Sequence, residues 1–199
     1  MSSVSKPSTS SATSDYSRLH YVKRMDLIKF DADDRSRYCR VMVYNETHGM
    51  LAVSQPSFTA LMPGYGVRRI NVLDLRVEKF VCLHKEPIRD MAFNPVLRDQ
   101  LLSVSQDKSA RLTNISSCCE IQRYMVGAEV WSCCWHLDQP TAFFVGTKRS
   151  QILMYDTRDS GTEPRTQLEF PVNERRPIIG LAYVPADSKH STFPCGGEP

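Results

Sequence analysis

Two side chains in this sequence, His84 and Asp107, are of the types that form general-base pairs in enzymes. The serine of an α/β-hydrolase stands on a strand–turn–helix elbow, and no segment here has that pattern. The sequence also lacks a P-loop, a dinucleotide-binding glycine pattern and an H-E-x-x-H motif. We therefore expect no catalytic residue and favour a structural role for His84 and Asp107.

The spacing of the cysteines gives no support for a metal or cofactor site. None of the seven cysteines forms a C-x-x-C pair: Cys39, Cys82, Cys118, Cys119, Cys133, Cys134 and Cys195. Zinc sites use such pairs, so we expect no metal and no cofactor in this chain, and reduced thiols that pack as small hydrophobic groups. The net charge of +3 and the absence of an interleaved basic and aromatic patch argue against direct nucleic-acid binding. No apolar run is long enough for a membrane span.

Recurring short strands must position these residues. Strands that end in an aromatic residue finish at 44, 93, 135 and 183, at intervals of 49, 42 and 48 residues. Three equivalent strands follow each of the first three, with turn residues between them. Four strands per period of about 40 to 45 residues is typical of a β-propeller. We predict an all-β fold with four-stranded antiparallel blades at about 40–83, 87–125 and 130–170, and a fourth that starts at 178.

The second predicted blade has the pattern of a WD repeat. Such a repeat places a His before its first strand, a Ser or Thr in its second, an Asp in the following turn, and Trp-Asp at the end of its third. His84, Ser103 (or Ser105) and Asp107 match these positions, and Thr113 replaces the Trp. We expect the matching residues to form a buried hydrogen-bonded set that ties the blade's loops together, shortened where the Trp is missing.

The ring is predicted to be incomplete. Seven blades need roughly 280 to 320 residues at this period, so residues 19–199 form a partial propeller, which indicates a fragment or truncated product. Residues 1–18 are Ser-rich and predicted to be disordered. The segment 19–30 is a candidate strand for the missing last blade.

Several stretches resemble the WD-repeat region of the RING finger and WD repeat domain-containing E3 ubiquitin ligases. They include Pro63–Val67, Leu101–Ser105, Val130–Trp135 and Ser191–Gly197, in the family's order. The resemblance implies a nuclear, possibly also cytoplasmic, ligase that acts in the DNA-damage response and interstrand crosslink repair through replication protein A. The family's RING, with its zinc, is missing here, so no transferase activity is expected from this chain alone. The alternatives are a WD-repeat scaffold without a ligase and, with no convergent carboxylates to support it, a propeller hydrolase.

Antiparallel blades place alternate loops at opposite ends of the propeller. One end, which we call the first end, holds the loops that enter strand one and those that join strands two and three, and it carries an excess of positive charge. The long apolar segment Ser57–Tyr65 is predicted to be a loop there. We hypothesise that this end binds an acidic partner segment through four apolar and four basic residues. They are Phe58, Leu61, Met62, Tyr65, Lys148, Arg149, Arg175 and Arg176. The simpler interpretation is that the loop folds over its own blade and the charges are solvated.

Overall fold

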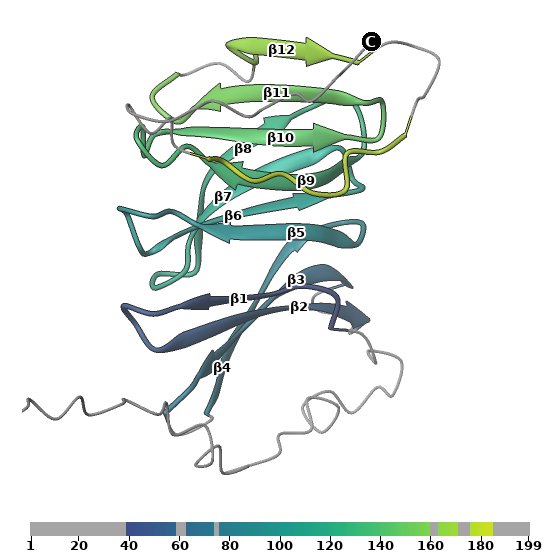
Figure 1. Cartoon of the computed structure of the whole chain (residues 1–199). Helices are drawn as coiled ribbons and strands as arrows, with labels where there is room; N and C mark the ends of the chain where they lie inside the picture. Colours follow the sequence, from purple (N-terminus) through teal and green to yellow (C-terminus); the bar gives the residue numbers. More distant parts are fainter. Residues whose placement is uncertain (1–38, 59–62, 74–75, 160–162, 171–175, 185–199) are drawn as a thin grey trace, which may run out of the picture.

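The computed structural model describes residues 39–58, 63–73, 76–159, 163–170 and 176–184 (Figure 1). These residues form twelve β-strands, and the described ranges contain no helix. The strands make three four-stranded antiparallel sheets, each in chain order. The predicted all-β, partial propeller is therefore confirmed. Ring closure is not seen in the described part of the chain.

Each sheet is one blade. Blade 1 contains β1 (Met42–Asn45), β2 (Met50–Phe58), β3 (Pro63–Asn71) and β4 (Val77–His84). Blade 2 contains β5 (Ile88–Phe93), β6 (Gln100–Ser105), β7 (Ser109–Asn114) and β8 (Cys119–Met125). Blade 3 contains β9 (Val130–Trp135), β10 (Ala142–Thr147), β11 (Gln151–Asp156) and β12 (Thr166–Glu169).

The blades stack on one another in chain order (Figure 1). One cluster of buried apolar residues joins blades 1 and 2, and another joins blades 2 and 3. Tyr124 of blade 2 contacts Phe143 and Tyr155 of blade 3, with ring centroids 5.0 and 5.2 Å apart. All three side chains are fully buried. Burying a side chain of this size contributes about 1.5–3 kcal/mol, so these aromatic rings hold the two blades together.

Hydrogen bonds between the inner strands set how neighbouring blades meet. The Cys133 amide of β9 donates to Asp90 Oδ2 of β5 at 2.9 Å, and Trp135 Nε1 donates to the Ala92 carbonyl at 3.0 Å. The turn residue Asn94 likewise donates through Nδ2 to the Pro140 carbonyl at 2.7 Å. Such directional contacts fix the relative position of two sheets, which apolar packing alone leaves free to slide.

The expected loop at 57–65 is corrected by the structure. β2 and β3 extend into it, with Ser57 paired to Gly64 and Phe58 to Pro63, so only residues 59–62 lie between the strands. Pro and Gly in this segment suggested a turn. β3 also pairs on its other side, with β4, and it has glycine where that strand comes close, because a Cβ at Gly66 would clash with the Val81 carbonyl oxygen of β4. Only glycine lets the two backbones approach so closely.

After blade 3, residues 176–184 run beside its inner strands as an extended segment that is not assigned as a strand (Figure 1). The Ile178 amide donates to the Thr147 carbonyl at 3.1 Å, and Ser132 Oγ donates to the Ile178 carbonyl at 2.6 Å. This is the place predicted for the start of a fourth blade. The rest of that blade, the tail 1–18 and the segment 19–30 lie outside the described residues.

No helix suited to crossing a bilayer occurs in the described ranges. The six described cysteines are free thiols. Burial raises the pKa of the Cys133 thiol well above its usual value, as expected of a cysteine packed as a hydrophobic side chain.

Candidate functional site

The three residues predicted from the WD pattern meet in the structure. His84 Nε2 lies 2.9 Å from Ser103 Oγ, and His84 Nδ1 lies 3.0 Å from Asp107 Oδ2. His84 ends β4, Ser103 lies in β6, and Asp107 lies in the turn between β6 and β7. The set therefore joins the outer strand of blade 1 to blade 2.

The order Ser–His–Asp is also that of a serine hydrolase triad, but burial argues against that chemistry. Ser103 is 0% exposed and His84 is 2% exposed, so no substrate can reach either side chain. A nucleophilic serine must present its hydroxyl to an accessible carbonyl carbon. The geometry therefore supports the structural role that the repeat pattern predicted.

The protonation states follow from burial and from the partners. Burial lowers the pKa of His84, and its hydrogen bond to Asp107 offsets this only in part. His84 is thus a neutral imidazole, whose Nδ1–H donates to Asp107 while Nε2 accepts the Ser103 hydroxyl proton. Burial by itself raises the pKa of Asp107, but its hydrogen bonds with His84, Ser109 and the Lys85 amide outweigh this and hold that pKa well below its usual value.

Asp107 is the centre of the set because it accepts from several donors. Ser109 Oγ donates to Oδ1 at 2.6 Å and the Ser109 amide at 3.0 Å, while the Lys85 amide reaches Oδ2 at 3.2 Å. These donors come from the start of β7 and from the β4–β5 loop. One carboxylate therefore fixes the loops at the first end of blade 2.

The missing Trp changes this network in a way that the sequence did not predict. Thr113, which replaces it, is buried, and its Oγ1 has no hydrogen-bond partner in the described residues. Arg111 extends the network instead. Its Nη2 lies 3.7 Å from Asp107 Oδ2, and its Nη1 pairs with Glu120 Oε2 of β8 at 2.8 Å. The expected shortening at Thr113 is therefore offset by an ion pair that reaches the outer strand.

The apolar residues predicted for partner binding are described only in part. Tyr65 lies in β3 opposite His84 and packs, partly buried, against the core of blades 1 and 2. Phe58 ends β2, but its side chain lies outside the description, as do Leu61 and Met62. The packing of Tyr65 agrees with a segment folded over its own blade. Partner binding by these residues stays a prediction.

The predicted basic residues come together where described. Lys148 and Arg149 occupy the β10–β11 turn, and the next residue, Ser150, donates through Oγ to the Arg176 carbonyl at 2.6 Å. Arg149 and Arg176 are exposed, while Lys148 Nζ pairs with Glu129 at 2.7 Å. Arg175 lies outside the described residues. A cationic surface at the first end thus has a structural basis, whereas its role stays a prediction.

A second feature of the first end was missed by sequence reasoning. The guanidinium carbon of Arg89, in β5, lies 3.9 Å from the centroid of the Trp131 ring in β9. Trp131 Nε1 donates to Glu129 Oε2 at 3.4 Å, and Glu129 also pairs with Lys148. The sequence carries one indication of this contact. Arg89 and Trp131 each stand four places before the aromatic residue that ends their strand.

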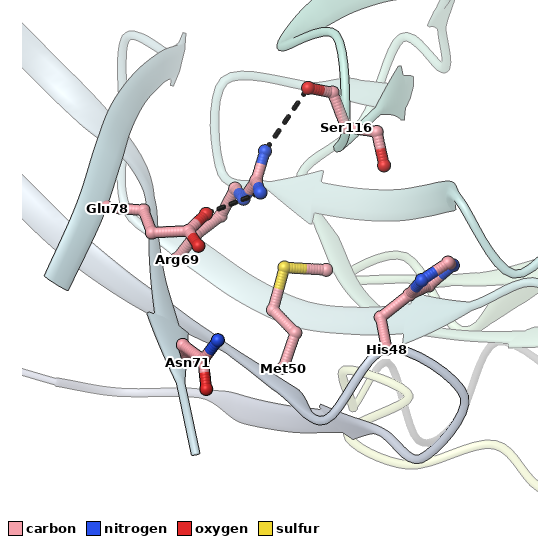
Figure 2. A pocket seen from close by; sticks show the side chains of 6 residues that line it. All are labelled: His48, Met50, Arg69, Asn71, Glu78 and Ser116. Atoms are coloured by element: carbon pink, nitrogen blue, oxygen red, sulfur yellow. Dashed lines mark hydrogen bonds and ion pairs between the residues drawn. The ribbon is translucent and has the colours of Figure 1, made fainter. Parts of the chain in front are cut away.

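At the opposite end, Arg69 joins blade 1 to blade 2 beside a cavity of about 180 Å³ (Figure 2). Its Nη1 donates to the Ile115 carbonyl at 2.6 Å and the Ser116 carbonyl at 3.2 Å, and its Nη2 pairs with Glu78. Arg69 thus contacts both blades, while its buried Nε has no hydrogen-bond partner among the described residues. We interpret this cavity as part of their junction.

Metal binding needs several ligand side chains that converge on one point. No group of three or more His, Cys, Asp or Glu side chains is placed to hold a metal ion in the part of the chain that the structure describes.

The chain matches one family of known proteins. Residues 34–198 match the family model described as the E3 ubiquitin-protein ligase RFWD3 WD40 domain. The chain is 35% identical over 160 residues to E3 ubiquitin-protein ligase RFWD3 of Homo sapiens, and 36% and 33% identical to the proteins of that name from Ailuropoda melanoleuca and Mus musculus. Each match covers 80% of this chain and 20% of the relative. The matched region is thus about a fifth of each relative's length.

Proposed function

Because the chain belongs to the RFWD3 WD40 domain family, we propose that it is the partner-binding portion of a RING-type E3 ubiquitin ligase. A WD40 domain binds proteins, and the blades here present loops on rigid sheets for that purpose. In this proposal, the chain selects a substrate or adaptor, and a RING supplied elsewhere in the assembly recruits the ubiquitin-conjugating enzyme.

We further propose that the partner is replication protein A and that the chain acts in the nucleus, in the DNA-damage response and interstrand crosslink repair. This part of the proposal rests on the family resemblance. The observation that carries the general proposal is the match over residues 34–198, which spans all three blades. The buried state of His84 and Ser103 agrees with it, because it favours a binding role over hydrolysis.

The cationic first end supports a partner with an acidic surface. Lys85, Lys108 and Arg149 are exposed there on loops that project from blades 2 and 3. Opposite charges steer association and set its dependence on salt. An acidic segment of the partner would therefore bind at this end with an affinity that falls as ionic strength rises.

A direct binding measurement tests the proposal. We would titrate purified replication protein A with the 199-residue chain in low and physiological salt, and repeat this with Lys148, Arg149, Arg175 and Arg176 replaced together by Glu. We expect binding by the wild-type chain and a loss of about tenfold or more for the variant. Arg149→Glu and Arg98→Glu, single charge reversals at the first and at the opposite end, are the charge-matched pair of controls.

The outcomes separate the levels of the proposal. No binding by the folded wild-type chain would refute replication protein A as its partner. Binding with unchanged affinity and salt dependence in the quadruple variant would keep the partner but exclude these four basic residues from the interface.

A further inference from the structure

Four residues occupy equivalent positions where the inner strands begin at the first end. Each stands four places before the aromatic residue at or next to the end of its strand or extended segment. They are Arg40, Arg89, Trp131 and Ile179. The inner strands of neighbouring blades contact one another, β1 with β5 and β5 with β9. These equivalent side chains therefore form a row across the blades, which we call the inner rim.

Within the inner rim, Arg89 is held in place without a carboxylate partner. Its guanidinium stacks on Trp131, with 3.9 Å between the guanidinium carbon and the ring centroid. Its Nε is buried and makes no hydrogen bond to any described residue. Stacking on an aromatic ring orients a guanidinium while leaving its N–H groups free to donate. Arg89 as a whole is only partly buried, so an acceptor on a ligand would meet the terminal Nη groups rather than the enclosed Nε.

The carboxylate whose charge acts on Arg89, that of Glu129, has other partners. Glu129 pairs with Lys148 Nζ at 2.7 Å and accepts from Trp131 Nε1 at 3.4 Å and Gln106 Nε2 at 3.3 Å. These contacts lower the pKa of Glu129, the largest effect coming from Lys148. Glu129 therefore lies at the edge of the Trp131 ring and shares its charge between Lys148 and these neighbours.

Arg40 adds a second positive charge. It is exposed, and its side chain pairs with no described carboxylate. Burial and the charge of Arg40 lower the pKa of Arg89, and the charge of Glu129 offsets this in part. Two neighbouring guanidinium groups repel each other unless an anion lies between them. At the other end of the row, Ile179 is 75% exposed and offers an apolar contact. The inner rim thus combines two cations that need an anion with an aromatic ring and an exposed apolar side chain.

We propose that the inner rim, formed by Arg40, Arg89, Trp131 and Ile179, binds an acidic peptide segment of a protein partner. Carboxylates of that segment accept from the two arginines, and an adjacent apolar side chain of the segment contacts Trp131 and Ile179. This inference rests on the proposed binding function and deepens it, because it moves the main contact from the outer loops to the inner strands. Centrally placed arginine and tryptophan side chains commonly carry much of an interface's affinity.

Single-stranded nucleic acid is the competing ligand, because it also combines negative charge with groups that stack. Base stacking needs an open aromatic face. In this structure Arg89 covers one face of Trp131, and Glu129 lies at the edge of the ring. A peptide is thus the better fit.

The test uses the 199-residue chain and three fluorescein-labelled probes. The first is a short synthetic peptide in which Asp and Glu flank a central Phe, the second has Lys in place of the acids, and the third is oligodeoxythymidine. We would measure anisotropy with Arg40→Glu, Arg89→Gln and the charge-matched control Arg98→Glu. The fluorescence of Trp131, one of only two tryptophans, gives a local readout that Trp131→Phe removes.

We expect the acidic peptide to bind most tightly, and Arg40→Glu and Arg89→Gln each to weaken it about tenfold, while Arg98→Glu leaves its affinity within about twofold. Arg40 is exposed, so its variant tests the charge without disturbing the core. Unchanged peptide affinity in Arg40→Glu, or tighter binding of oligodeoxythymidine than of the acidic peptide, would overturn the inference.

The same variants separate this inference from the proposed function. If the wild-type chain binds replication protein A and Arg40→Glu binds it equally well, the inner rim is not the contact and the proposed function stands. If the acidic peptide binds at the inner rim but replication protein A does not bind the chain, the site stands and the proposed partner fails.

Discussion

Replacing Asp107 with Ala removes the acceptor at the centre of the blade 2 network. The change leaves the His84 Nδ1–H, the Ser109 hydroxyl and two backbone amides without their acceptor. It also leaves Arg111 with Glu120 as its remaining carboxylate partner. An unsatisfied buried donor costs about 1–3 kcal/mol, and breaking a buried charged contact costs about 3–5 kcal/mol.

These costs do not add, because the Asp107 side chain is 8% exposed and water can reach some of the released donors. We therefore expect Asp107→Ala to lower the free energy of unfolding by about 3–5 kcal/mol. Asp107→Asn is the control. Its Oδ1 can still accept from the Ser109 groups, and its Nδ2 can donate to the other tautomer of His84. A loss of about 1–2 kcal/mol is expected for this variant.

Urea titration with tryptophan fluorescence as the signal measures both values. Trp135, which contacts Phe143 in the blade 2–blade 3 core with 5.6 Å between ring centroids, reports on the packing next to the network. Equal and small losses for the Ala and Asn variants, below about 1 kcal/mol, would show that the carboxylate does not organise these loops. A double-mutant cycle with Ser103→Ala should be non-additive, because both residues bind His84.

Three further predictions concern the titrating groups of the network, the junction of blades 2 and 3, and the segment after blade 3. The free energy of unfolding should fall as the pH is lowered from about 7. The lowered pKa of His84 means that the unfolded chain takes up protons before the folded one, and the lowered pKa of Asp107 continues the loss at more acid pH. Urea midpoints between pH 7 and 4 measure this. Trp135→Phe should cost about 1–2 kcal/mol or more by removing a hydrogen bond to β5 and some buried ring volume; because Trp135 is the fluorescent reporter, circular dichroism follows this urea titration, and an unchanged midpoint would contradict the prediction. Gly146→Ala should displace the segment around Ile178, whose Cβ lies 2.7 Å from the position of the new methyl group, and limited proteolysis at residues 176–184 should become faster.

The repeat spacing was enough to predict the blades because strands and turns are encoded locally. The aromatic ends at 44, 93 and 135 fall in or at the end of the inner strands β1, β5 and β9. The hydrogen-bonded set was equally predictable. A WD repeat has fixed places for His84, Ser103 and Asp107, so a partial match to its pattern was enough to identify them as one set.

The segment 57–65 shows where local signals fail. Pro56, Pro63 and Gly64 predicted a loop, but β2 and β3 pair through most of it. Gly64, which pairs with Ser57, lies so close to β4 that a Cβ there would be 2.6 Å from the His84 carbonyl oxygen, so this segment is held against the neighbouring strand. Local preferences of this kind are overridden when a tertiary partner supplies hydrogen bonds.

Sequence by itself thus determined the four-stranded blades, their order and the residues of the buried His–Ser–Asp set. These depend on spacing within one repeat, which a linear pattern records. Only the tertiary structure decided that Arg111 extends this set to Glu120, that Arg69 reaches the Ile115 carbonyl in the next blade, and that Arg89 stacks on Trp131. The last two contacts join different blades. All three depend on side-chain rotamers and on the orientation of the blades relative to one another, which the spacing of residues along the chain does not encode.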